Sequence, residues 1–338
     1  MLAFAACSSE DEGAPPAGPV TTDDASTNPG AEGGGGSSSG GSSSGGTDAG
    51  ADAGPNLANL QKLKAQMLTS FWENDTTVFQ YAFARNNNDG FGYTAGRIGF
   101  TTATGDGYEI VTCFDSAFTG AGNLRKKYEP PLKVLYDKLA MTGQIQPNVS
   151  TLDAVGNYPA DWTATANNAT TAPAFHGCQD QRVDLRYWAP TLPIMQKWGI
   201  TTALSRAALY DATVVHGEDN VNNLAKQANN DTGNTAQTPA AAPLSETAES
   251  NWLKAFLIHR AALVNSSVAW KAAIARCANY EQWRRDGNFD FSKKLVTNAT
   301  ADVMFPGNGY TSNGYQACVI NPDGSVSGVP QCTAPVSN

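Results

Sequence analysis

Between residues 71 and 106 the chain reads FWENDTTVFQYAFARNNNDGFGYTAGRIGFTTATGD. Upstream of this stretch, apolar residues recur at helical spacing from Leu57 onwards, which predicts an amphipathic helix that ends near Glu73. Within the stretch, helical spacing continues over residues 77–85. The turn formers of residues 86–90 follow directly and predict a sharp change of direction.

The rest of the chain is expected to be mostly helical. Residues 93–102, rich in Gly, Tyr and Thr, predict short strands that form a single small sheet. Helical spacing recurs at residues 123–141, 179–188, 190–216, 246–264 and 268–285. Loops rich in Asn, Thr, Ala and Pro are expected near residues 148–174 and 226–243. A mainly helical fold of this length forms either one large domain or two lobes around a cleft.

The first 55 residues differ in composition from the rest and are set apart from the fold. Residues 1–7 form a short apolar run before Cys7, which resembles the end of a bacterial lipoprotein signal. Residues 8–55 are rich in Gly, Ser and Asp and are expected to be a disordered linker. We therefore expect an extracellular or cell-surface protein with a lipid anchor at Cys7. The alternative is a chance cysteine after an Ala-rich start.

The net charge of −9 says little about a partner. Eight of the 31 acidic residues lie in the first 55 residues, which carry no Lys or Arg, so the remainder has 23 acids and 22 bases. A nearly neutral folded part gives no reason to expect nucleic acid as a partner. Only acids placed in a cleft would indicate a cationic polymer.

The cysteines and histidines limit redox and metal chemistry. Cys318 and Cys332 enclose a short segment and are expected to form a disulfide within a C-terminal extension over residues 292–338. The other cysteines outside the leader are Cys113, Cys178 and Cys277. At most one further bridge can form among these three, and the pairing stays open. No pattern of zinc ligands is present, so neither a metal nor another cofactor is expected.

Two acids in the quoted stretch lie in contrasting surroundings. Glu73 follows Phe71 and Trp72, and apolar surroundings favour the protonated form of an acid. Asp89 lies in a Gly-flanked turn, where backbone amides and water favour the ionised form. Such a pair is typical of general acid and base roles. Spacing alone leaves open that Glu73 only ends a helix and that Asp89 only supports a turn.

Charged residues on apolar helix stripes indicate buried ion pairs. Asp211 shares a stripe with Leu204, and Arg260 and Arg276 occupy apolar faces of two later helices. Because a buried charge is costly unless it is paired, Asp211 is expected to bind one or both arginines. The network is either purely structural or also tunes a catalytic acid. His216 ends the Asp211 helix, where a histidine is more often a structural hydrogen-bonding group than a catalyst.

A longer pattern in this stretch consists of Glu73-Asn74, Tyr81, Asp89-Gly90, Thr94, Ile98-Gly99 and Asp106. It resembles the signature of glycoside hydrolase family 46, the chitosanases, and a weaker likeness continues to about residue 291. Two features depart from the signature. The segment between Asn74 and Tyr81 is shorter than usual, and Phe91 stands where the family has Arg or Asp, which puts one substrate contact in question.

The resemblance implies a two-lobed, lysozyme-like fold, mainly α-helical, with a small β-sheet beside the catalytic cleft. Residues 56–291 would form this catalytic domain. The implied activity is endo-acting, inverting hydrolysis of the β-1,4 bonds of chitosan by a monomer. Glu73 matches the general acid, Asp89 the general base, and Thr94 the residue that helps hold the attacking water.

The resemblance also assigns supporting roles. The implied substrate contacts are Asp106, which binds a sugar amine, together with Tyr93, Arg97 and His216. The implied charged network behind the general acid consists of Asp211, Arg260 and Arg276, which agrees with the buried charges expected from the helix faces.

Two other functions remain open at this point, because acid and base carboxylates do not by themselves choose the sugar. One is a chitinase or a lysozyme-like muramidase on a related fold, which would favour acetamido groups over amines. The other is a tethered, non-catalytic polysaccharide-binding protein, which would bind chitosan without releasing reducing ends.

Overall fold

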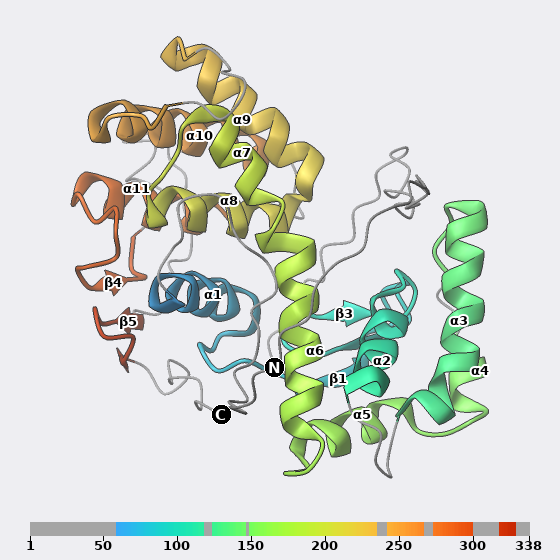
Figure 1. Cartoon of the computed structure of the whole chain (residues 1–338). Helices are drawn as coiled ribbons and strands as arrows, with labels where there is room; N and C mark the ends of the chain where they lie inside the picture. The colour runs from blue at the N-terminus through green and yellow to red at the C-terminus, as the bar shows by residue number, and fades with distance from the viewer. Residues whose placement is uncertain are drawn as a thin grey trace, which may run out of the picture.

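The computed structural model describes residues 59–117, 124–146, 149–234, 242–266, 273–299 and 318–328. Its elements lie on two sides of a central helix, α6 (Ala172–Val183), and form two lobes (Figure 1). A π-helical segment, η1 (Asp184–Trp188), continues α6 directly. The expectation of a mainly helical, two-lobed fold is confirmed.

The smaller lobe contains the first sheet. Its strands are β1 (Ala84–Asn86), β2 (Tyr93–Ala95) and β3 (Phe100–Thr101). They are antiparallel in the order β1-β2-β3, and Thr94 pairs with Arg85 on one side and with Thr101 on the other. The helices of this lobe are α2 (Asp106–Ala117), α3 (Leu124–Thr142), α4 (Ser150–Asp153) and α5 (Tyr158–Asn167). The predicted sheet is thus confirmed, with β1 as an additional strand.

The larger lobe is built around α8. Its helices are α1 (Asn59–Asn74), α7 (Thr191–Trp198), α8 (Ala203–His216), α9 (Glu218–Thr232), α10 (Glu246–Ser266) and α11 (Ile274–Arg285). Most of α8 is buried, and α1 and α11 both pack against it. Trp72 of α1 lies against Tyr280 and Trp283 of α11, with ring centroids 5.4 and 6.2 Å apart. These aromatic contacts hold α1 and α11 together near Glu73.

The prediction of a helix over residues 77–85 is wrong. α1 ends at Asn74, and Asp75 adopts a φ of 55°. This positive φ lies outside the right-handed helical region, so the helix cannot continue through Asp75. The following Thr76, Thr77 and Val78 are β-branched and therefore weak helix formers. Residues 84–86 pair instead with β2, the next strand along the chain, so pairing between the two strands overrode the local helical spacing.

The loop expected over residues 148–174 is also wrong, because α4, α5 and the start of α6 lie within it. The sequence did contain start signals for α5: the Asn157 side chain accepts the Ala160 N–H at 3.2 Å, and a proline follows in the first turn.

Two further boundaries differ. α9 extends into the loop expected over residues 226–243. Residues 190–216 form two helices rather than one, because Gly199 adopts the left-handed φ of 69° that ends α7.

A second sheet corrects the expectation of only one. Its strands are β4 (Leu295–Val296), β5 (Cys318–Ile320) and β6 (Val326–Gly328), antiparallel in that order. They belong to the extension expected over residues 292–338. Strands of two or three residues are too short to show the alternation that would reveal them in a sequence.

The disulfide pattern closes one open question. Cys113 of α2 and Cys178 of α6 form a bridge with their Cα atoms 5.7 Å apart, whereas Cys277 is free and buried. Cys318 is also disulfide-bonded. Its expected partner, Cys332, lies outside the described residues, as do the signal and linker expected over residues 1–55.

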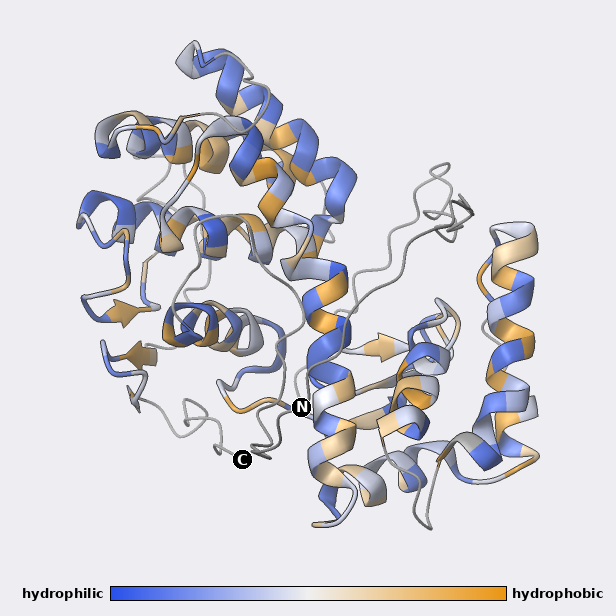
Figure 2. Ribbon diagram, in the orientation of Figure 1, coloured by the Kyte–Doolittle hydropathy of each residue, from blue (hydrophilic) through white to orange (hydrophobic). Residues whose placement is uncertain are grey.

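Each lobe has its own aromatic core. The largest fully buried side chains include Trp162 in the smaller lobe and Trp252 and Trp283 in the larger one. The helices carry both hydrophobic and hydrophilic residues (Figure 2), as helices do that bury one face and expose the other. Among the helices that the structure describes, none combines the length and the apolar character needed to cross a membrane.

Candidate active site

Glu73 lies in the last turn of α1, where its side chain is 31% exposed. Its Oε1 atom lies 2.6 Å from Nη2 of Arg276, a residue of α11. The same guanidinium donates to the main-chain oxygen of Trp72 at 3.4 Å. Arg276 therefore orients the predicted general acid and also binds the main chain of α1, the helix that carries this acid.

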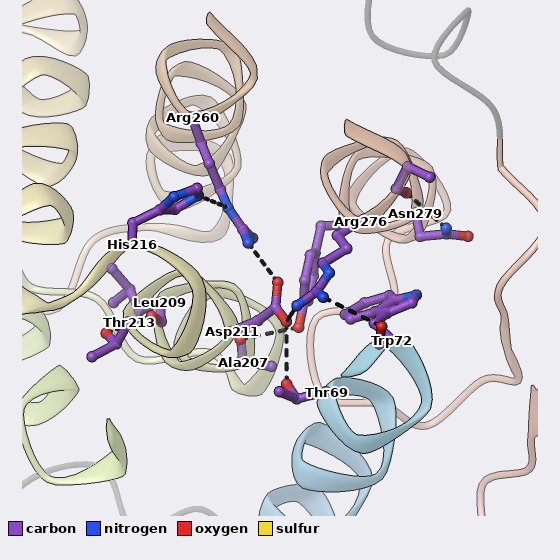
Figure 3. Close-up of polar contacts among 12 residues, drawn as sticks. Thr69, Trp72, Ala207, Leu209, Asp211, Thr213, His216, Arg260, Arg276 and Asn279 are labelled. Carbon is purple, nitrogen blue, oxygen red and sulfur yellow. Dashed lines mark hydrogen bonds and ion pairs between the residues drawn. The ribbon is translucent and has the colours of Figure 1, made fainter. Parts of the chain in front are cut away.

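Behind this pair lies Asp211 of α8, which is fully buried together with Arg260 of α10 (Figure 3). Oδ2 of Asp211 lies 2.6 Å from Arg260 Nη2, and Oδ1 lies 3.1 Å from Arg276 Nη1. Thr69 of α1 donates its hydroxyl to Oδ1 at 3.3 Å. The expectation that Asp211 binds buried arginines is confirmed, and it binds both of them.

The charges in this network support one another. Burial alone would raise the pKa of Asp211, but the Arg260 and Arg276 guanidinium groups outweigh burial and hold that pKa below its ordinary value. Asp211 therefore stays ionised at neutral pH. Because Arg276 points at two carboxylates, Asp211 balances part of the positive charge that faces Glu73.

His216 belongs to the same network. Its Nε2 atom accepts the Arg260 Nε–H at 3.4 Å, and only 6% of the residue is exposed. Burial, with further repulsion from Arg260, lowers the pKa of His216 to about 3. The neutral imidazole thus contacts Arg260, at the end of the network away from Glu73, the predicted general acid. The predicted contact of His216 with substrate stays a prediction.

Asp89 lies in the loop between β1 and β2 and is partly exposed. The loop turns sharply there, since Asn88 and Gly90 both adopt positive φ angles, of 55° and 88°. The Phe91 N–H donates to Asp89 Oδ1 at 3.0 Å. This main-chain contact fixes the carboxylate and leaves part of it open to water, as a general base requires.

Thr94 follows on β2, with its Oγ1 atom 3.0 Å from Nδ2 of Asn87. Since the amide donates in this contact, the hydroxyl proton of Thr94 can point at another acceptor, such as a water. Asn87 is a residue of the site that sequence reasoning missed. Its place in a cluster of turn-forming residues gave no hint of a contact seven residues away.

Asp106 begins α2 and is buried. Oδ1 accepts hydrogen bonds from Arg182 of α6 at 3.0 and 3.2 Å, and Arg186 Nε lies 3.8 Å away. Oδ2 accepts the Thr104 hydroxyl at 2.9 Å. The structure therefore gives Asp106 arginine partners, and its predicted contact with a sugar amine stays a prediction.

Arg97 contacts the central helix α6, and Tyr93 contacts α4 of the smaller lobe. Arg97 is buried, forms an ion pair with Asp180 of α6, and lies 3.7 Å from the centre of the Phe79 ring. Tyr93 donates its hydroxyl to Asp153 of α4 at 2.5 Å. Both residues thus connect the sheet to surrounding helices, and their predicted contacts with substrate stay predictions.

A small pocket lies beside Glu73. Its lining residues are Gln66, Thr69, Ser70, Glu73, Asn74, Arg97, Ile98 and Tyr210. In the part of the chain that the structure describes, no group of three or more His, Cys, Asp or Glu side chains is placed to hold a metal.

The fold and the site together define a class of protein. A carboxyl group at a helix end, a second carboxylate in a glycine-flanked loop and two lobes around them are typical of glycoside hydrolases that use acid and base carboxylates. This class is the one indicated by the sequence pattern.

Comparison with known proteins identifies the family. The sequence model of glycosyl hydrolase family 46 matches residues 67–295. A chitosanase of Bacillus subtilis (strain 168) is 31% identical over 242 residues, which cover 69% of this chain and 79% of that protein. The chain belongs to glycosyl hydrolase family 46.

Solved structures agree with this assignment. A mutant chitosanase from Bacillus subtilis MY002, complexed with 6 GlcN, has a TM-score of 0.58 at 27% identity, covering 77% of this chain and all of that one. The Gynuella sunshinyii GH46 chitosanase in complex with chitotetraose has a TM-score of 0.57 at 25% identity, covering 71% of this chain and 95% of that one.

Proposed function

We propose that this chain, a chitosanase that hydrolyses chitosan, cleaves within the polymer and inverts the anomeric carbon. Glu73 donates the proton to the leaving oxygen, and Asp89 activates the water. The observation that carries the proposal is the chain of ion pairs from Arg260 through Asp211 and Arg276 to Glu73. Burying these charges costs desolvation energy, whereas a glutamate that merely ends a helix is usually surrounded by water.

The acid role depends on orientation and on charge. Arg276 fixes the direction of the Glu73 carboxyl group, whose side chain remains accessible from solvent. When Glu73 gives up its proton, the nearby guanidinium stabilises the carboxylate that forms. Because Asp211 shares Arg276, the cation does not act on Glu73 alone. The arrangement therefore favours proton donation in the transition state.

The base role depends on a water held on the opposite side of the sugar. Asp89 is fixed through one oxygen by the Phe91 N–H, so the rest of its carboxylate can accept a proton from water. The Thr94 hydroxyl, oriented by Asn87, can contact the same water. Inverting enzymes separate their two carboxyl groups by about 6.5 to 9.5 Å to admit that water.

The stereochemical experiment uses proton NMR of the first products from chitosan. An inverting enzyme acting on β-1,4 bonds releases the α anomer first, so β anomers appearing first would refute the mechanism. Glu73→Gln and Asp89→Asn should each lower kcat by about two orders of magnitude or more without changing the melting temperature. Asp75→Asn, an acid-to-amide change at an exposed neighbour of Glu73, is the matched control and should retain activity.

Cleavage within the polymer is supported by relatives whose solved complexes contain 6 GlcN and chitotetraose, since sites for several sugars suit internal binding. The test follows the viscosity of a chitosan solution and the concentration of reducing ends during the same digestion. Cuts inside the chain reduce viscosity long before many reducing ends appear. A viscosity that falls only in proportion to released ends would show that the enzyme works from chain ends.

We further propose that the enzyme is exported and tethered through Cys7. Support comes from the apolar run before Cys7 and the Gly- and Ser-rich residues 8–55. The full-length protein should then be found in the membrane fraction of cells that make it, and Cys7→Ala should release it. Equal amounts of both forms in the membrane fraction would contradict the anchor.

A further inference from the structure

The second sheet contacts the two helices that meet at Glu73. Its strands β5 and β6 lie beyond residue 295, where the match to the family ends. In Figure 1, β4 and β5 lie beside α1 and below α11. The sheet is therefore an addition to the matched catalytic region, and its contacts with that region decide what it can do.

The contact with α1 is made by Lys64, which is only 2% exposed. Its Nζ atom donates to the main-chain oxygens of Phe291 at 2.9 Å and Pro322 at 2.5 Å. Pro322 lies in the turn between β5 and β6, while Phe291 precedes β4. A single buried ammonium thus joins α1 to the chain just before β4 and to the turn between β5 and β6. Burial lowers the pKa of Lys64, and Asp323 and Asp290 oppose that effect.

The turn that presents the Phe291 oxygen is held in an unusual shape. Phe291 adopts a φ of 59°, a conformation that is costly for an aromatic residue. The Asn288 side chain braces the turn by hydrogen bonds of 2.9 and 3.2 Å to the main chain of Lys293. Such a conformation persists only where surrounding contacts determine it.

The contact with α11 is made by Asn279, which is fully buried one turn after Arg276. Its Oδ1 atom accepts the Ala299 N–H at 3.1 Å. Two residues earlier, the hydroxyl of the buried Thr297 accepts the Cys318 N–H at 2.9 Å, and Cys318 begins β5. Two hydrogen bonds, joined by the chain of residues 297–299, therefore connect α11 to the added sheet.

We propose that β4, β5 and β6 form a clasp that fixes α1 against α11 and so positions Glu73 on Arg276. The inference rests on the proposed role of Glu73 as general acid. Lys64 lies about 13 Å before Glu73 along the axis of α1. The clasp holds that end of α1, while the Trp72 ring packs on α11 at the other end. Lys64 and Thr297 are thus positioning residues for the acid.

The experiment uses full-length variants. Lys64→Met removes the ammonium at nearly constant length, and Thr297→Val removes a hydroxyl inside the clasp without touching α1. The control, Thr165→Val, removes a buried hydroxyl that donates to the main-chain oxygen of Asp161 at 2.8 Å in the smaller lobe. We measure kcat and KM on chitosan well below the melting temperature, and amide hydrogen exchange over the last turn of α1 and over β5.

Both clasp variants should lower kcat about ten-fold or more with little change in KM, because a misplacement of about 1 Å at a catalytic group costs up to 100-fold. Exchange should rise in β5 and also in the last turn of α1, and the control should change neither. If exchange rises only in β5 while kcat is unchanged, the sheet merely stabilises the fold and the proposal is wrong.

The two readouts also separate this inference from the proposed function. Thr297→Val is nearly isosteric, so it provides the test even if Lys64→Met fails to fold. Hydrogen exchange reports on the coupling between β5 and α1 whether or not the enzyme cleaves chitosan. An inactive wild type with coupled exchange would overturn the role of Glu73, whereas an active wild type with uncoupled exchange would overturn the clasp.

Discussion

Asp211→Ala should remove a large part of the stability of the larger lobe. Asp211 and Arg260 are both 0% exposed and lie 2.6 Å apart, so the substitution leaves the Arg260 guanidinium in the protein interior without its carboxylate. Breaking a buried pair from one side costs about 3 to 5 kcal/mol. Arg276 suffers less, because it keeps Glu73 as a partner. The decrease in the free energy of unfolding should therefore correspond to one buried guanidinium without a carboxylate partner, not to two.

The assay is thermal and urea unfolding of the wild type and variants at pH 7. In a domain of this size, about 1 kcal/mol shifts the melting temperature by about 2 to 4 °C, so the expected decrease is roughly 6 to 20 °C. The matched control is Asp137→Ala. Asp137 pairs with Lys133 at 2.8 Å on the surface of α3, where both side chains are about half exposed. That loss should be at most about 0.5 kcal/mol.

Two results would refute the reasoning. The first is a melting temperature for Asp211→Ala that matches that of the control, which would mean that water reaches Arg260. The second concerns the double variant Asp211→Ala with Arg260→Leu. Removal of the stranded cation should return part of the lost stability, because neither charge is then buried alone. A double variant less stable than Asp211→Ala would show that some other contact carries the loss.

Two further predictions concern pH and substrate. The pKa of His216 is about 3 in the folded protein and about 6.5 when exposed, so the unfolded state binds more protons between these values. His216 should therefore lower the free energy of unfolding by about 1.4 kcal/mol per pH unit as the pH falls from about 6.5 towards 3, and His216→Gln should flatten this dependence in urea titrations. Parallel curves would mean that His216 is already protonated or exposed. Phe91→Arg should change KM more than kcat, because the main-chain N–H that holds Asp89 is kept. A large fall in kcat at constant KM would instead assign the placement of Asp89 to the Phe91 ring.

The sequence was most informative about buried charges, because such groups require a partner of opposite charge. An aspartate on the apolar face of α8 requires a cation nearby, and the sequence places Arg260 and Arg276 on apolar faces of two later helices. Their pairing was therefore predictable without knowing the fold. The acid at the end of α1 and the turn around Asp89 were likewise marked by local patterns, namely helical periodicity and a cluster of turn formers.

The sequence was least informative where a role depends on a distant partner. Arg97 and Asp106 fit a family pattern, but nothing in their neighbourhood reveals that Asp180 and Arg182 of α6 bind them. The same limit applies to secondary structure. Residues 84 and 85 belong to a strand because they pair with β2, whereas their own spacing favoured a helix. Local patterns predict which groups must be paired, while the fold decides which groups pair.

The buried network also requires a reason beyond stability. Replacing a buried ion pair by well-packed apolar residues is often neutral or stabilising, so Asp211 and Arg260 are a poor choice if they only support the fold. Their position suggests that they set the charge next to Glu73, since Asp211 is the group that shares Arg276 with the acid. The double variant Asp211→Ala with Arg260→Leu separates these roles, because it leaves Arg276 with Glu73 as its remaining carboxylate in the network. If the network tunes the acid, kcat should stay depressed by a factor of about 100 or more even where stability returns. If activity recovers together with stability, the network is purely structural.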